Sequence, residues 1–166
     1  MVTTAHSRSR SRPQENPQDA LRAVAQAYAH HGWAVFPVEG KVPLTRHGVT
    51  DATTDPALVE RLFAGSRATG IAVACGASGL LVVDLDGEEG RAAWGSLTAR
   101  HGGHPRTLTA RTSSGFHLYY SGEGPSTARR LGPGIDTRGR GGYVVAPPSV
   151  HASGHRYRWH YPSVPI

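Results

Sequence analysis

The chain has almost no cysteine, almost no lysine and no long apolar run. Among its 166 residues Cys75 is the one cysteine, which excludes an internal disulfide framework and a cysteine-based zinc site. No apolar stretch approaches the length that crosses a bilayer, and the N-terminus lacks the apolar core of a secretory signal. We therefore expect a cytoplasmic protein that has no membrane partner.

Positive charge in this chain is carried almost entirely by arginine. Eighteen Lys and Arg residues face 12 Asp and Glu residues, a formal net charge of +6, and Lys41 is the single lysine. Arginine makes forked contacts with phosphate groups, and a basic balance favours polyanionic partners. The composition therefore favours nucleic acid or nucleotides as ligands.

The N-terminal end differs from the rest of the chain. Residues 1–15 are polar and basic, include Ser-Arg-Ser-Arg-Ser-Arg at 7–12 and have no apolar periodicity, so we predict a disordered tail there. Residues 16–166 are long enough for one domain with its own core. Helical spacing of apolar residues predicts helices at 16–31, 55–63 and 88–100, the first two starting at Asn16-Pro17 and Asp55-Pro56.

Short apolar segments separated by glycine predict the strands. We expect strands at 33–38, 70–75, 80–85, 107–112, 116–121, 135–137, 142–147 and 155–161. Residues 40–44 are expected to form a loop. Short connections predict two hairpins, one joining 70–75 to 80–85 and one joining 107–112 to 116–121. Helices in the first half and strands in the second indicate an α+β domain.

Two carboxylates end the strand predicted at 80–85. Asp84 and Asp86 are separated by Leu85, and residues two apart in a strand point to the same side, about 6.5–7 Å apart along the chain. Such a pair could hold a divalent metal for phosphate chemistry. It could equally be a capping acid and a turn acid before a helix. Spacing alone leaves both interpretations open.

Two later segments also carry polar groups. Strand alternation places His117 on the same face as Tyr119. Asp136 lies at a strand end, followed by Arg138 and Arg140 in a glycine-rich turn, where the backbone can approach a ligand and arginine can bind phosphate. A structural histidine and an ordinary basic hairpin loop are the alternative interpretations.

Together these segments resemble the N-terminal domain of bifunctional DNA primase/polymerases, in the archaeo-eukaryotic primase superfamily. The matching motifs occur in collinear order within about residues 20–160: Val83-Asp84-Leu85-Asp86, Gly115-Phe116-His117, and Ile135-Asp136 with Arg138 and Gly141-Gly142. The resemblance implies a prim-pol catalytic domain at 16–166. It also implies an α+β, RRM-like core with a mixed or antiparallel sheet and flanking helices.

The resemblance further implies a template-dependent DNA primase/polymerase that uses two-metal nucleotidyl transfer in plasmid, phage or mobile-element replication. The partners that the resemblance implies are template and primer DNA, nucleoside triphosphates and a replicative helicase. By this resemblance Mg²⁺ or Mn²⁺ is ligated by Asp84, Asp86 and Asp136. The resemblance also implies that the nucleotide is bound by His117, Arg138, Lys41 and Arg140.

Two other functions compete with this prediction. A nucleotide-sugar glycosyltransferase could use Asp84 and Asp86 with Mn²⁺, but it has no need for His117 and Asp136 in this order. A non-catalytic nucleic-acid-binding or nucleotide-binding remnant of a replication protein is the second. The early end of the chain after the last expected strand favours the remnant, whereas the presence of all three acids favours the enzyme.

Overall fold

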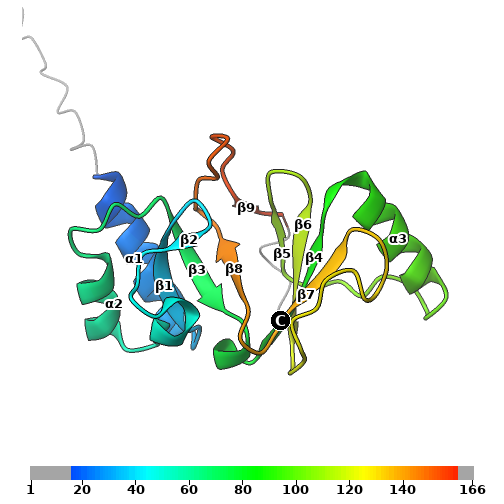
Figure 1. Cartoon of the computed structure of the whole chain (residues 1–166), viewed down its shortest axis with the longest axis horizontal. Coiled ribbons are helices and arrows are strands. Elements are labelled where there is room, and N and C mark those ends of the chain that lie inside the picture. Colours follow the sequence, from blue (N-terminus) through cyan, green and yellow to red (C-terminus); the bar gives the residue numbers. More distant parts are fainter. Residues whose placement is uncertain (1–15, 161–166) are drawn as a thin grey trace, which may run out of the picture.

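The computed structural model describes residues 16–160 and shows two antiparallel sheets with three α-helices (Figure 1). Sheet A contains, in spatial order, β2 (Val42–Pro43), β1 (Val35–Glu39), β3 (Gly70–Ala74) and β8 (Tyr143–Ala146). Sheet B contains β7 (Ile135–Arg138), β4 (Leu80–Leu85), β6 (Phe116–Ser121), β5 (Thr109–Arg111) and β9 (Arg158–Trp159). The predicted α+β class is confirmed. The predicted tail at 1–15 lies outside the described residues.

Two helices pack against sheet A, and both begin as predicted. Helix α1 (Pro17–His30) starts at Asn16, whose side chain accepts a hydrogen bond from the Gln18 N–H. Helix α2 (Pro56–Phe63) starts at Asp55, which accepts from two backbone N–H groups of its first turn. A polar side chain at this position satisfies N–H groups that have no partner within the helix.

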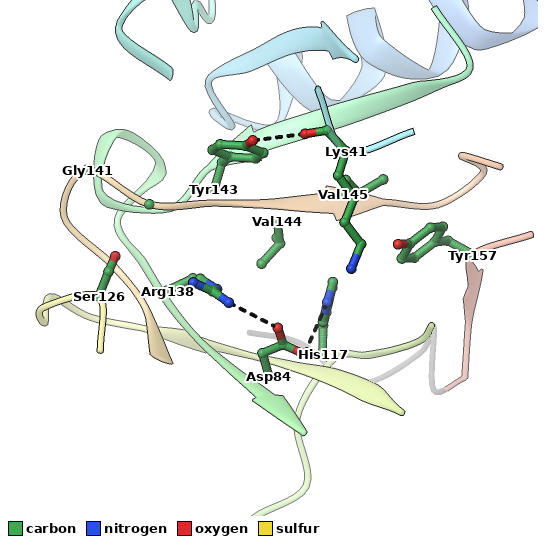
Figure 2. A pocket seen from close by; sticks show the side chains of 11 residues that line it. Lys41, Asp84, His117, Ser126, Arg138, Gly141, Tyr143, Val144, Val145 and Tyr157 are labelled. Carbon is green, nitrogen blue, oxygen red and sulfur yellow. Dashed lines mark hydrogen bonds and ion pairs between the residues drawn. The ribbon is translucent and has the colours of Figure 1, made fainter. Parts of the chain in front are cut away.

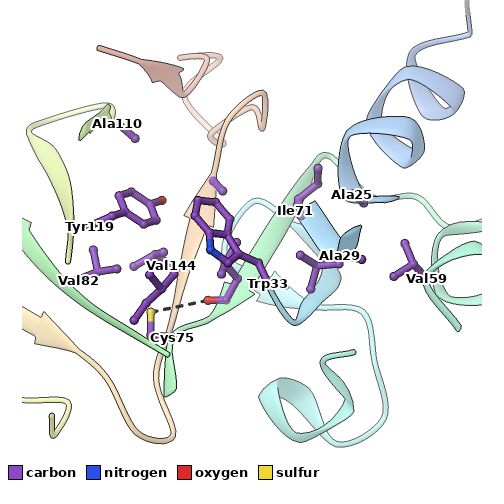
Figure 3. Close-up of a cluster of buried hydrophobic side chains, with 14 of the residues drawn as sticks. Ala25, Ala29, Trp33, Val59, Ile71, Cys75, Val82, Ala110, Tyr119 and Val144 are labelled. Carbon is purple, nitrogen blue, oxygen red and sulfur yellow. Dashed lines mark hydrogen bonds between the residues drawn. The ribbon is translucent and has the colours of Figure 1, made fainter. Parts of the chain in front are cut away.

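One apolar core joins these helices to both sheets (Figure 3). It runs from Ala25 and Val59 on the helices through Ile71 of sheet A to Val82 on the inner face of sheet B. At its centre the ring of Trp33 stacks on that of Tyr119, with ring centroids 5.7 Å apart. Because the two sheets share this core, their relative orientation is fixed by packing.

The third helix, α3 (Gly87–Ala99), lies on the outer face of sheet B (Figure 1). A separate apolar cluster of Val83, Leu85, Leu118 and Ile135 packs beneath it with Trp94. Alternation along β4 therefore sends Val83 and Leu85 outward to α3 and leaves Asp84 on the inner face.

Three expectations about the strands are wrong. The segments 70–75 and 80–85 do not form a hairpin, because β3 is already paired on both edges, with β1 and β8, and β4 belongs to sheet B. The 3-10 turn η2 (Gly76–Ser78) and Gly79, in the left-handed conformation (φ 65°), carry the chain from one sheet to the other. The strands form two sheets where one was expected, and the 40–44 loop contains β2.

Other local predictions are confirmed. Strands β5 and β6 form the predicted hairpin around Ser113-Ser114-Gly115. The last predicted strand is shorter than expected, at Arg158–Trp159. A further 3-10 turn, η1 (Gly48–Asp51), precedes α2. Within residues 16–160 no helix combines the length and apolar character that a bilayer-spanning segment needs. The RRM-like arrangement stays a prediction.

Candidate active site

Three neighbouring strands of sheet B place polar residues in one row. Asp84 of β4 is the direct cross-strand partner of His117 on β6 and of Asp136 on β7. Directly opposed residues point to the same face of a sheet, so all three side chains lie on the inner face. Arg138, two residues after Asp136, shares that face.

This row forms the floor of a cleft between the sheets (Figure 2). Two adjoining pockets of about 380 Å³ each share Lys41, Asp84, His117, Arg138 and Tyr157. A volume of this size is in the range of small-molecule sites. Sheet A closes the opposite side of the cleft with the residues around β8, including Tyr143, Val144 and Val145.

Arg138 bridges the two strand carboxylates. Its Nη2 lies 2.9 Å from Oδ2 of Asp136 and 3.6 Å from Oδ2 of Asp84. Asp136 also accepts a hydrogen bond at Oδ1 from the Arg129 backbone N–H, at 3.0 Å. One guanidinium therefore offsets much of the repulsion between two adjacent negative charges.

His117 is almost fully buried in the cleft, with 9% of its side chain exposed. Its Nε2 lies 3.5 Å from Oδ1 of Asp84, and its ring packs between those of Tyr119 and Tyr157. Burial lowers the pKa of His117 below its ordinary value, and this effect outweighs the opposing attraction of Asp84. A neutral imidazole can donate from one ring nitrogen and accept at the other.

Asp86 occupies a different position from the strand acids. It follows the last residue of β4 and stands at the N-cap of α3, but its side chain caps no N–H there. Its Oδ1 instead accepts a hydrogen bond of 2.7 Å from the Ser114 hydroxyl, in the β5–β6 turn. Asp86 lines the cleft together with Asp84 and Asp136. The structure thus brings all three acids to one cleft but pairs only Asp84 with Asp136.

The donor chemistry of this cleft fits a hard divalent cation. Adjacent carboxylates are the ligands that Mg²⁺ and Mn²⁺ prefer, and Asp84 and Asp136 are adjacent. The present side-chain arrangement is not yet a coordination shell, because Arg138 stands between them. Among the described residues no three His, Cys, Asp or Glu side chains are grouped closely enough to hold an ion. Metal ligation by the three acids stays a prediction.

The predicted basic residues divide into two groups. Lys41 and Arg138 line the cleft. Arg140, which was predicted to bind the nucleotide, is exposed and is not among the lining residues. Its backbone N–H donates to the carbonyl of Gly124, and its Cα packs against Gly76. These contacts fix the backbone of the turn, and nucleotide binding by Arg140 stays a prediction.

Sequence reasoning missed three residues of the cleft. Ser114 positions Asp86, the Arg129 backbone N–H binds Asp136, and Tyr157 covers His117. Ser114 belongs to the turn immediately before the His117 motif, which was a usable signal. No local pattern marks Tyr157, because it comes from a distant segment that folds back over the cleft.

Comparison with protein families identifies the family to which the chain belongs. A family model for the bifunctional DNA primase/polymerase N-terminal domain (Prim-Pol) matches residues 25–166. The chain belongs to this family. A comparison with curated proteins gave no match. The Prim-Pol match spans both sheets and every element that contributes to the cleft, so the three motifs recognised in the sequence belong to one family domain.

Proposed function

We propose that this Prim-Pol domain is a template-dependent DNA primase/polymerase that transfers nucleotidyl groups from nucleoside triphosphates with two divalent metal ions. The observation that carries the proposal is the row His117–Asp84–Asp136, which presents acids and a phosphate-binding type of residue side by side in one cleft. Family membership supports DNA and nucleotides as substrates.

The basic residues of the cleft are suited to the triphosphate. Lys41 and Arg138 supply positive charge on opposite sides of the cleft, from sheet A's β1–β2 connection and from β7 (Figure 2). His117, whose pKa is lowered by burial, can donate a hydrogen bond from a ring nitrogen to a phosphate oxygen. The buried position of its ring fixes the direction of that hydrogen bond.

The acids are suited to Mg²⁺ or Mn²⁺, held by Asp84 and Asp136 with Asp86. Metal ions held by these residues would activate the primer 3′-hydroxyl and stabilise the pyrophosphate leaving group. A triphosphate competes with the two carboxylates for the guanidinium of Arg138, because phosphate is an equally good forked partner. Nucleotide entry therefore frees the carboxylates at the moment when they are needed.

We place this reaction in the replication of a plasmid, phage or mobile element, with a replicative helicase as partner. The family match supports a role in DNA synthesis, and the plasmid, phage or mobile-element setting and the helicase are part of the proposal.

Primer extension tests the proposal. The wild-type domain should add nucleotides to a primed template with Mg²⁺ or Mn²⁺, and Asp84→Asn or Asp136→Asn should lower the rate at least about a hundredfold, since metal ligation supplies several kcal/mol of charge stabilisation. The control is Asp19→Asn, an exposed acid on α1 that pairs only with Arg22 in the described structure. Equal loss in the control, or full activity in both cleft variants, would contradict the assignment.

A non-catalytic nucleotide-binding domain is the second candidate. It is favoured by the Arg138 bridge and by the lack of a grouped set of three ligands in residues 16–160. Nucleotide binding measured by calorimetry, together with no incorporation by the wild type under any metal condition, would establish it.

A further inference from the structure

The outer face of sheet B is only partly covered. Helix α3 packs over β4 and β7, at one side of the sheet. Beyond it, towards β5 and β9, lies a groove of about 350 Å³. We call it the outer groove, and its lining includes Arg91, Trp94, His104, Phe116 and His160. It lies on the opposite face of sheet B from the cleft, since its floor is formed by Leu85 and Leu118.

Aromatic rings dominate this groove. The Phe116 and His160 rings have centroids 5.5 Å apart, and the guanidinium carbon of Arg91 lies 6.0 Å from the Phe116 ring centre. Trp94 donates from Nε1 to Nδ1 of His104 at 2.9 Å, which fixes the indole at the groove wall. Partly exposed rings held in fixed positions are the surface on which unpaired bases stack.

Two arginines extend the groove towards the sheet edge. Phe116 of β6 is the cross-strand partner of Arg111 on β5, and Arg111 is the partner of Arg158 on β9. The three side chains therefore form a row on the outer face. Arg111 and Arg158 are exposed, and neither forms an ion pair with a carboxylate in the part of the chain that the structure describes.

We propose that the outer groove binds single-stranded DNA. Its bases stack on Phe116 and Trp94, and its phosphates contact Arg111 and Arg158. Charge complementarity selects a polyanion, because Arg111 and Arg158 form no ion pair in the described structure and the pairing of Arg91 is with a single acid, Glu88. The open aromatic rings select unpaired bases over a duplex, whose bases are already stacked.

The outer groove also has a direct route to the cleft. Arg111 and Phe116 flank the β5–β6 turn, and Thr112, Ser113 and Ser114 of that turn line the cleft on the other side. A strand that leaves Phe116 across this turn arrives beside Asp86. The identification of the bound strand as the template rests on the proposed function. The binding of single-stranded DNA to the outer groove does not depend on it.

Fluorescence anisotropy with a labelled oligo-dT of about 16 nucleotides measures this binding directly, the length being that of a large single-strand site. Phe116→Leu should weaken binding about tenfold, as expected for loss of one stacked base. Arg111→Ser and Arg158→Ser should each weaken it several-fold and reduce its salt dependence. The matched control is Arg61→Ser, which removes one exposed arginine from α2, outside sheet B.

A second measurement locates the bases. Oligo-dT should quench the tryptophan fluorescence of the wild type. The Trp94→Phe variant should lose most of this quenching but still bind oligo-dT, because phenylalanine also provides a ring on which a base can stack. Circular dichroism and thermal melting of every variant identify any that fail to fold, and Arg111→Ser, on an exposed position, keeps the test available if Phe116→Leu does not fold.

The outcomes separate the two proposals. Outer-groove variants that bind oligo-dT as tightly as Arg61→Ser would overturn the groove assignment. Equal competition by a blunt duplex of the same length would also overturn it. If the wild type binds oligo-dT through Phe116 and Arg111 yet extends no primer, the groove stands and the proposed polymerase activity fails.

Discussion

Asp84 and Asp136 lie directly opposite each other on β4 and β7, and a single nitrogen of Arg138 lies within 3.6 Å of an oxygen of each. Like charges on paired strand positions repel each other. A cation near both carboxylates therefore stabilises this arrangement. Arg138 supplies that cation in the structure described above.

Removing this guanidinium should destabilise the domain. We expect Arg138→Leu to lower the free energy of unfolding by about 1–2 kcal/mol at pH 7, a value reduced for the partial exposure of the three side chains. Mg²⁺ at millimolar concentration should restore much of the loss, because a bound metal replaces the missing charge. Urea unfolding with EDTA or with Mg²⁺ measures both effects.

The matched control for this experiment is Arg22→Leu, which breaks exposed ion pairs of α1 with Asp19 and Glu60. Its stability should change by less than about 1 kcal/mol and should not respond to Mg²⁺. An identical response of the two variants to Mg²⁺ would contradict a metal site at the Asp84–Asp136 pair.

His117 should make stability depend on pH. Burial lowers the pKa of His117 from 6.5 in the folded state, so the unfolded chain binds more protons as the pH falls below that value. The contribution of neutral His117 to the free energy of unfolding is therefore fully present above about pH 6.5. It declines at lower pH, by up to about 1 kcal/mol for each pH unit. His117→Gln should remove this part of the decline.

Urea unfolding of wild type and His117→Gln between about pH 5 and 8, in EDTA, gives the difference. Both proteins keep Asp84, Arg138 and Lys41, the charged groups that face the ring, so their contributions largely cancel. Parallel pH profiles would show that His117 is not buried as the neutral form.

Tyr119 offers a change that should stabilise the protein. Its hydroxyl is fully buried and has no hydrogen-bond partner among the described residues. Leaving such a group unpaired costs about 1–3 kcal/mol, so Tyr119→Phe should raise the free energy of unfolding by about 1 kcal/mol and keep the stack on Trp33. Tyr28→Phe is the opposite control, since the Tyr28 hydroxyl donates to the Pro147 carbonyl and its loss should destabilise. Thermal and urea unfolding compare the two.

Cys75 should be unreactive in the folded protein. Its side chain is fully buried, and burial raises the pKa of the thiol to about 12. Reactivity requires the thiolate and access to it. A thiol reagent at pH 8 should therefore label Cys75 only in denaturant, at a rate that follows global unfolding. Rapid labelling under native conditions would show that the core between the two sheets opens locally.

Local sequence patterns predicted most of the elements and part of the cleft. Asn16-Pro17 and Asp55-Pro56 set the helix starts, and alternation placed His117 and Tyr119 on one face, because these depend on neighbours in the chain. The division into two sheets could not be predicted, since it depends on β8 pairing with β3 after a long excursion through sheet B. For the same reason nothing local revealed that Arg138 bridges two acids or that Arg140 lies outside the cleft.

The turn at Gly76–Gly79 has a consequence for how the protein folds. In chain order, β8, the last strand of sheet A, follows β4, β5, β6 and β7 of sheet B. Strand β9, the last of sheet B, follows β8. Both walls of the cleft therefore depend on pairings between distant segments. Pairings over such long sequence separations slow folding. During synthesis one edge of β3 stays unpaired until β8 has been made. An unpaired strand edge can pair with a strand of another chain, so this edge is where the nascent chain is most prone to aggregate.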